Sequence, residues 1–225
     1  MSDNEKEGSS RAELRERIVV KAMEFFRKSG IKSITMDDIA ASLGISKRTL
    51  YEVYRDKETL LRECILKNQQ EMNDFLSQVL AKSTNVMEVI LICYQRSIED
   101  FHKTNKRFFE DIKKYPKIYE LMNNYRDRDS DSTIAFFRMG VEQGIFRSDV
   151  NFAIVNLLVR EQLDLLMNTD VCKEYSFLEV YESIMFTYIR GISTERGAKV
   201  LDDFIIEYRE SRLNLSGSKV PGTNN

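Results

Sequence analysis

The sequence predicts an all-α protein, because hydrophobic residues recur with helical spacing and few residues interrupt helices. Among its 225 residues there are two prolines and nine glycines, which favours long helices over short strands joined by tight turns. No segment alternates between apolar and polar residues in the way that a half-buried strand does. We therefore expect an N-terminal three-helix domain, followed by a larger C-terminal helical domain.

The first helix is expected to begin at Arg11. Residues 1–10 are polar and end in Gly-Ser-Ser, so we expect them to form a disordered tail. Gly30 is a natural stop, because glycine readily adopts the left-handed conformation that ends many helices. The apolar stripe of this helix comprises Leu14, Ile18, Ala22 and Phe25, and it is widened by Val19, Met23 and Phe26.

Two short helices are expected next. Thr35 and Asp38 have the spacing of a capping box and predict a helix start, and Gly44 breaks this helix after Leu43. Ser46 is expected to cap a third helix that reaches about residue 54. Residues 11–56 would thus form the small domain.

The larger domain is expected to span residues 57–212. A helix over residues 57–81, capped by Asp56, would connect the two domains. Pro116 suits a first helical position and predicts one long helix that stops at Gly144. Other helices are expected over residues 85–102, 106–114, 151–168 and 176–192 and from residue 194 onward, followed by a disordered tail at 213–225.

The composition disfavours catalytic, metal-binding and membrane roles. His102 is the only histidine, which weakens the case for imidazole-dependent catalysis and for most transition-metal sites. The three cysteines, Cys64, Cys93 and Cys172, are far apart and are interpreted as buried free thiols. The apolar stretches 86–93 and 150–159 are shorter than the roughly 20 residues of a membrane span. We expect a cytoplasmic protein that is not an enzyme and has no cofactor.

The net charge of -2 is unevenly distributed. Residues 11–62 contain twelve Lys and Arg against eight Asp and Glu, which gives this segment a charge of +4 and the remainder -6. A basic end on an acidic chain is typical of a local nucleic-acid contact.

Residues 35–57 carry the main functional signal and read TMDDIAASLGISKRTLYEVYRDK. Two short helices joined by a tight turn pack at a steep angle, which needs a small residue at the contact and a turn residue that tolerates left-handed geometry. Ala40 and Gly44 meet these needs. The third helix would expose cationic and hydroxyl side chains near its N-terminus, as a helix in the DNA major groove does. The aliphatic residues that would hold the pair together are Ile39, Leu43, Ile45, Leu50 and Val53.

The segment ITMDDIAASLGISKRTLYEVYRDKETLL resembles the helix-turn-helix signature of the TetR family of transcriptional regulators, within a match over residues 18–61. The resemblance implies a homodimer of all-helical subunits that binds operator DNA and is released by a small ligand. Tyr51 and Lys57 would hold phosphates. The positions that match DNA-contacting positions of the family are Thr35, Ser46, Lys47, Arg48, Thr49, Tyr51 and Lys57. Val53 departs from the usual His or Tyr, and Tyr54 from the usual Phe; Tyr54 is interpreted as core.

Aromatic residues between the expected long helices could surround a small apolar ligand, or could simply be helix core. The ligand candidates are Tyr94, Phe101, Phe109, Tyr119, Tyr125 and Phe137.

The helices expected at 151–168 and 176–192 have little purely polar face, which favours burial at a subunit interface. The candidate dimer contacts are Phe152, Val155, Val159, Leu163, Met167, Tyr181, Met185 and Tyr188.

Three functions remain open at this point. The favoured one is a homodimeric repressor that binds double-stranded DNA and is released by a ligand. The second is a helical ligand carrier or enzyme that contains a helix-turn-helix-like element. The third is a DNA-binding activator.

Overall fold

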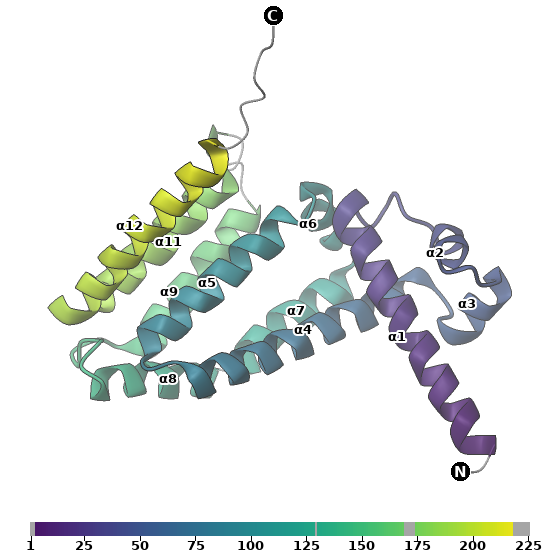
Figure 1. Ribbon diagram of the computed structural model, residues 1–225, viewed down its shortest axis with the longest axis horizontal. Helices are drawn as coiled ribbons and strands as arrows, with labels where there is room; N and C mark the ends of the chain where they lie inside the picture. Colours follow the sequence, from purple (N-terminus) through teal and green to yellow (C-terminus); the bar gives the residue numbers. More distant parts are fainter. Residues whose placement is uncertain (1–2, 129, 169–173, 218–225) are drawn as a thin grey trace, which may run out of the picture. The chain divides into compact units, whose positions relative to one another are not determined.

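The structure is a computed structural model that describes residues 3–128, 130–168 and 174–217. Within these ranges the regular structure is α-helical, which confirms the predicted fold class (Figure 1). An isolated antiparallel bridge joins Phe146 to Ser193. The helices are α1 (Asp3–Ser29), α2 (Met36–Leu43), α3 (Lys47–Val53), α4 (Lys57–Lys82), α5 (Val86–His102), α6 (Lys106–Ile112), α7 (Pro116–Arg128), α8 (Ser130–Glu142), α9 (Phe152–Asn168), α11 (Phe177–Ile192) and α12 (Glu195–Gly217).

Both expected tails are partly helical. Helix α1 begins at Asp3, within the segment 1–10 that we expected to be disordered. Its first residues, DNEKE, include good helix formers and place negative charge at the helix N-terminus, where the helix dipole favours it. Helix α12 continues to Gly217, past the expected end at residue 212. Residues 218–225 of the expected C-terminal tail lie outside the described residues.

The helix expected from Pro116 to Gly144 falls on α7 and α8, which cover Pro116–Arg128 and Ser130–Glu142. Residue 129, between them, lies outside the described residues.

The chain divides into two compact units, and the division differs from the expected one at residue 56. Unit 1 comprises residues 1–79 and 95–128, and unit 2 comprises residues 80–94 and 129–225. The structure thus groups most of α4, together with α6 and α7, with the three N-terminal helices.

In unit 1, α1 packs against α2 and α6. Ile18, Ala22 and Phe26 of α1 are fully buried. Their i, i+4, i+8 spacing places them on one helix face, where they meet Ile39 of α2 and Leu50 of α3, which are also fully buried. This shared core fixes α2 and α3 against α1.

In unit 2, α9 packs against α8 and α11, and α12 packs against α11. The core is rich in aromatic rings. Phe137 stacks on Phe152 with ring centroids 5.1 Å apart, and Phe146 lies 5.7 Å from Phe137. The connection into α12 is held by Thr194, whose amide donates to the carbonyl of Ile145 at 3.0 Å.

Candidate nucleic-acid interface

The start of α2 is fixed by a reciprocal pair of hydrogen bonds. The Asp38 amide donates to the Thr35 hydroxyl at 3.1 Å, and the Thr35 amide donates to the Asp38 carboxylate at 2.8 Å. This confirms the predicted capping box. Hydrogen bonds from the hydroxyl and amide of Thr35 lower the pKa of Asp38, because they stabilise its ionised form.

The turn after α2 uses a left-handed glycine. Gly44 has φ of +65°, and the amide of Ile45 donates to the carbonyl of Ala40 at 3.1 Å. Ala40 is 3% exposed and lies on α2, which packs against α3. A small side chain at this position lets the two helices approach closely, as the sequence predicted.

Helix α3 is anchored at its start and along one face. The amide of Thr49 donates to the Ser46 hydroxyl at 3.0 Å, which confirms Ser46 as the N-cap. Leu50 is fully buried, and Tyr54, just after the helix, is 2% exposed and belongs to the same core, as predicted. The orientation of α3 is therefore set by packing, and its opposite face is left to solvent.

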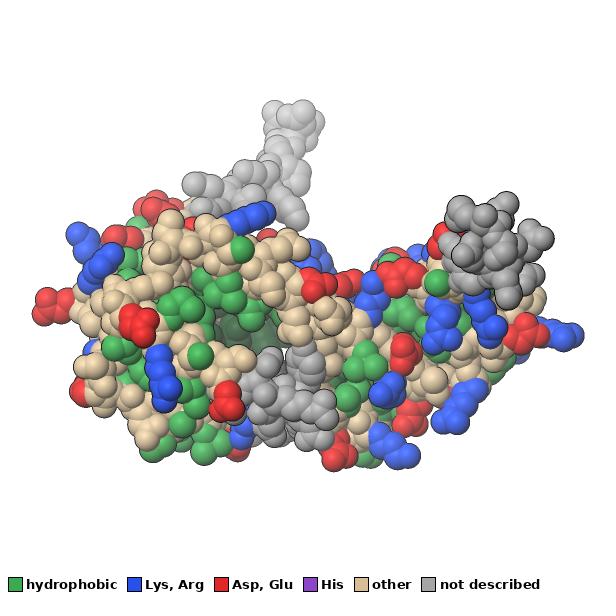
Figure 2. All heavy atoms as spheres, turned by 90° about the horizontal axis from the view of Figure 1, so that it is seen from below, with side chains coloured by type: hydrophobic (Ala, Val, Ile, Leu, Met, Phe, Trp, Pro, Cys, Tyr) green, Lys and Arg blue, Asp and Glu red, His purple; other side chains and the backbone are tan. Residues whose placement is uncertain are grey.

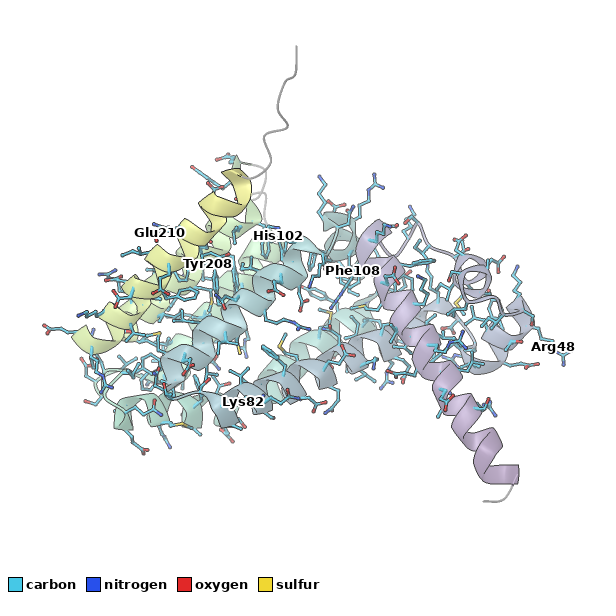
Figure 3. The ribbon with its side chains drawn as sticks, in the orientation of Figure 1. Arg48, Lys82, His102, Phe108, Tyr208 and Glu210 are labelled. Atoms are coloured by element: carbon cyan, nitrogen blue, oxygen red, sulfur yellow. The ribbon has the colours of Figure 1, made fainter. Side chains whose placement is uncertain are left out.

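That solvent face carries the side chains predicted to reach DNA. The side chains of Lys47 and Arg48 are 61% and 88% exposed, and Tyr51 is 44% exposed. Figure 3 shows Arg48 extending outward from α3. The hydroxyl of Thr49 lies 2.8 Å from that of Ser46, so both polar groups lie at the start of α3.

Each of the two cations has an acidic partner. Lys47 Nζ lies 2.5 Å from Asp37 Oδ2, and Arg48 Nε lies 2.8 Å from Glu52 Oε1. The hydrogen bond to Asp37 raises the pKa of Lys47, so it remains charged. Exposed ion pairs contribute little to stability, so a phosphate or a base edge could replace the carboxylates at small cost. The pairing with Asp37, ten residues away, was missed by the sequence analysis, because it depends on how α2 and α3 pack.

Figure 2 shows Lys and Arg side chains, with some acidic ones among them, over the side of unit 1 that carries α1–α3. This agrees with the +4 charge of residues 11–62. Such a face attracts a polyanion at low salt.

Lys57, expected to contact a phosphate, makes hydrogen bonds within unit 1. Its ammonium donates to the carbonyls of Ile31 and Ile34, at 2.8 and 2.7 Å, and burial lowers its pKa. It therefore ties the start of α4 to the segment between α1 and α2. Nothing in the local sequence pattern indicates this contact, because the partners lie 26 and 23 residues earlier.

Comparison with known proteins identifies this arrangement. Residues 18–64 match the sequence model described as "Bacterial regulatory proteins, tetR family". These residues contain all of α2 and α3, the C-terminal part of α1 and the start of α4.

Over residues 18–64 the chain is therefore similar to the TetR family.

Two individual relatives are also described as transcriptional regulators. The chain is 30% identical over 100 residues to the uncharacterised HTH-type transcriptional regulator YvaF of Bacillus subtilis; the match covers 44% of this chain and 52% of that protein. It is 23% identical over 158 residues to the HTH-type transcriptional repressor KstR2 of Mycolicibacterium smegmatis, covering 68% of this chain and 77% of the relative. The match thus spans about half the length of the Bacillus relative. These relatives are described as regulators, which agrees with the expectation that the chain is not an enzyme.

A solved structure shows the same fold. A transcriptional regulator from Saccharomonospora viridis, crystallised in complex with choline, superposes with a TM-score of 0.65 at 20% identity, covering 82% of this chain and all of that chain. The similarity in fold therefore extends beyond the helix-turn-helix into unit 2.

The aromatic residues predicted to line one ligand pocket fall into separate groups. In unit 1, Phe101 stacks on Phe109 with centroids 5.7 Å apart, and Tyr119 packs against the core of that unit. In unit 2, Phe137 belongs to the phenylalanine core, whereas Tyr94 lies in a different aromatic group. The side chain of Tyr125 lies outside the described residues.

Tyr94 is 2% exposed, and its hydroxyl donates to Glu182 Oε1 at 2.8 Å. Its ring contacts those of Tyr181 and Phe186 on α11 and of Phe204 and Tyr208 on α12. Burial, together with the bond to Glu182, raises the pKa of Tyr94, so it remains a neutral hydrogen-bond donor.

Some of the predicted dimer contacts lie in the core of unit 2. Phe152 is 7% exposed and belongs to the core of unit 2, and Val155 and Met185 pack against that core. The large apolar residues exposed on α9 are instead Ile154, Leu157 and Leu158, at 54%, 46% and 47%. Because α9 is apolar around most of its circumference, periodicity alone could not separate its two faces. Val159, Leu163, Tyr181 and Tyr188 are half-buried, and the side chain of Met167 lies outside the described residues.

The cysteines and the histidine differ in how far they are buried. Cys64 is buried, which raises the pKa of its thiol to about 12, and Cys93 is half-buried; both side chains are thiols, whereas Cys172 lies outside the described residues. His102 is exposed at the end of α5 (Figure 3). Over the ranges that the structure describes, we find no helix long and apolar enough to cross a membrane.

Proposed function

We propose that this chain is a sequence-specific DNA-binding transcriptional regulator, acting as a homodimeric repressor that a small-molecule ligand releases from its operator. The residues assigned to DNA contact are Thr35, Ser46, Lys47, Arg48, Thr49 and Tyr51. Lys57 is assigned to positioning instead.

The observation that carries this proposal is the division of α3 into two faces. Leu50 is fully buried, whereas the adjacent Arg48 and Tyr51 project into solvent from a helix whose direction is fixed at both ends. A rigid helix with exposed cationic and hydroxyl groups can enter the major groove and donate hydrogen bonds to guanine edges and phosphates. The basic charge of the segment supports the same interpretation.

The homodimer is supported by α9. Ile154, Leu157 and Leu158 form an exposed apolar surface on one side of this helix. Such a surface favours association with another apolar surface, and the same surface of a second copy is the simplest partner. A two-fold dimer would present two α3 helices to half-sites about 34–36 Å apart on one duplex.

Repression and ligand release are supported by the relatives. One of them is described as a repressor, and one structural neighbour of the same fold holds choline. In unit 2 the Tyr94 ring contacts other aromatic rings, and its hydroxyl donates to the carboxylate of Glu182. A ligand bound there would contact both apolar and polar groups. The ligand would release the operator by binding more tightly to the conformation that does not bind DNA.

DNA binding is tested by a mobility-shift assay with the DNA upstream of the chain's own gene. Wild type should retard this DNA at low salt, and binding should weaken steeply as salt rises. The Lys47→Ala/Arg48→Ala variant should bind much more weakly, whereas Lys199→Ala/Arg209→Ala removes the same charge from α12 and should bind as wild type. Equal binding by the two double variants would remove the basis of the proposal.

Dimerisation is tested by sedimentation of Leu157→Glu/Leu158→Glu. This variant should be a monomer at concentrations where wild type is a dimer. Ile206→Glu is a matched control, because Ile206 is 57% exposed on α12. A monomeric wild type, or a dimeric Leu157/Leu158 variant, would contradict this interface.

The ligand and the sign of regulation need separate measurements. Native mass spectrometry of the purified chain tests whether a small molecule accompanies it. A reporter gene in a deletion strain separates a repressor from the alternative, a DNA-binding activator: expression rises on deletion in the first case and falls in the second.

A further inference from the structure

Unit 1 contains a pocket of about 470 Å³ between α1 and α4, away from the solvent face of α3. This volume lies within the range of small-molecule sites in proteins. None of the residues assigned above to DNA, ligand or dimer contacts is part of it.

The floor of the pocket is apolar. Val19 and Cys64, at 6% and 1% exposure, and the half-buried Met23 line it. Val20 lies on the same wall and is 50% exposed, which is unusual for a valine in the middle of a core helix. An apolar group in the pocket would cover Val20 and remove this surface from water.

The rim is predominantly cationic. Four basic side chains line the pocket, Arg27, Lys28, Lys67 and Lys103, against two acidic ones, Glu24 and Glu71. Lys67 is already paired with Glu16 and Glu71, and Lys103 with Glu99. Positive charge on the rim is therefore concentrated in Arg27 and Lys28.

Arg27 is the best-placed of these for recognition. It is half-buried, and one of its terminal nitrogens donates to the side-chain oxygen of Asn68 on α4. A guanidinium has five N–H donors, so this bond orients the group and leaves donors for a second acceptor. A partly desolvated guanidinium binds carboxylates strongly. Lys28, exposed on the same rim, adds charge.

We propose that this pocket binds a small amphiphilic carboxylate, with its hydrocarbon part on Val19, Val20 and Met23 and its carboxylate on Arg27 and Lys28. It is a site distinct from the ligand region proposed in unit 2, and the binding claim does not depend on DNA binding.

A molecule bound in this pocket would affect other helices of unit 1. Helix α1 packs against α2, and the Arg27 carbonyl accepts a hydrogen bond from the Asn105 amide, just before α6, at 2.7 Å. A molecule between α1 and α4 contacts both helices that flank the helix-turn-helix. Occupancy would thus bias the orientation of α2 and α3.

Isothermal titration of the full chain with decanoate tests the site. We expect saturable 1:1 binding, and at least about tenfold weaker binding by Arg27→Gln/Lys28→Gln, because a charge-assisted contact is lost. The control Lys106→Gln/Lys117→Gln removes two exposed cations of unit 1 outside the pocket and should bind as wild type. Decyltrimethylammonium has the same tail with the opposite charge and should bind at least about tenfold more weakly than decanoate.

Two further variants locate the binding. The chain has no tryptophan, so Val20→Trp is a single fluorescent reporter at the mouth of the pocket. Decanoate should shift its emission to the blue, while the emission of Leu76→Trp, 38% exposed on α4 in the wild type, should not change. Val20→Glu places a carboxylate at the mouth of the pocket and should weaken decanoate binding without unfolding the chain. The proposal is overturned if decanoate does not bind, if the Arg27/Lys28 variant binds equally well, or if only the Leu76→Trp emission changes.

Discussion

The ammonium of Lys57, at the start of α4, donates a hydrogen bond to the carbonyl of Ile34, at 2.7 Å. The same ammonium reaches the carbonyl of Ile31 at 2.8 Å. Both carbonyls lie in the segment between α1 and α2, so a lysine that the family resemblance assigns to phosphate binding here holds the backbone that leads into the helix-turn-helix.

Replacing Lys57 by methionine should therefore affect stability more than DNA contact. Loss of the donor leaves two carbonyls without a partner, and we expect the free energy of unfolding to fall by about 1–2 kcal/mol in urea denaturation. The dependence of log affinity on log salt should keep its wild-type slope. A slope smaller by about one would instead identify Lys57 as a phosphate contact.

Ser46 allows capping and DNA contact to be separated. Ser46→Ala should lower the free energy of unfolding by about 1 kcal/mol, since the amide of Thr49 loses its acceptor. Ser46→Asp restores an acceptor and should retain wild-type stability. It should nevertheless weaken DNA binding, because it adds a carboxylate beside the phosphates. A Ser46→Asp variant that binds DNA as tightly as wild type would show that the start of α3 lies away from DNA.

Two glycines with positive φ should respond differently to alanine. Gly44 has φ of +65° with no atom within 4 Å of an added Cβ, so Gly44→Ala should cost only backbone strain, about 1 kcal/mol. At Gly30, with φ of +86°, the added Cβ would lie 2.8 Å from Arg107 Cβ. Gly30→Ala should therefore cost more, about 2–3 kcal/mol, because overlap adds to strain. If urea denaturation showed the same loss of unfolding free energy for both variants, α6 would move away from the added methyl group without cost.

Asp111 of α6 should make stability depend on pH. Burial raises its pKa, but the hydrogen bond from the Lys32 amide, at 2.8 Å, and the ammonium of Lys114 outweigh burial, so the pKa lies below its ordinary value of 3.8. The ionised carboxylate thus stabilises the fold above pH 3.8, and this stabilisation is lost as the pH falls below that value.

Asp111→Asn keeps an acceptor for Lys32 but removes the charge. The difference in free energy of unfolding between wild type and this variant should be constant near neutral pH and should shrink as the pH falls through 3.8. A difference that grows on acidification would mean that burial, and not the hydrogen bond, controls this carboxyl.

The features that the sequence predicted well depend on near neighbours. The capping box at Thr35–Asp38 formed, because it joins residues three apart. The turn at Gly44 and the burial of Leu50 and Tyr54 likewise depend on short-range geometry and on hydrophobic spacing.

The features that it missed depend on distant residues or on ambiguous patterns. The contacts of Lys57 with Ile31 and Ile34, and of Lys47 with Asp37, arise only when separate elements pack. On α9, apolar residues on most sides gave no preference between Val155, which packs inward, and Leu158, which is exposed.

The central claim, that the exposed face of α3 reads DNA sequence, is tested most directly by selecting bound duplexes from a random-sequence pool. Wild type should enrich one sequence with two-fold symmetry, Lys199→Ala/Arg209→Ala should enrich the same sequence, and Lys47→Ala/Arg48→Ala should lose the preference. A wild-type protein that enriches nothing, or a Lys47/Arg48 variant that enriches the wild-type sequence, would contradict the account.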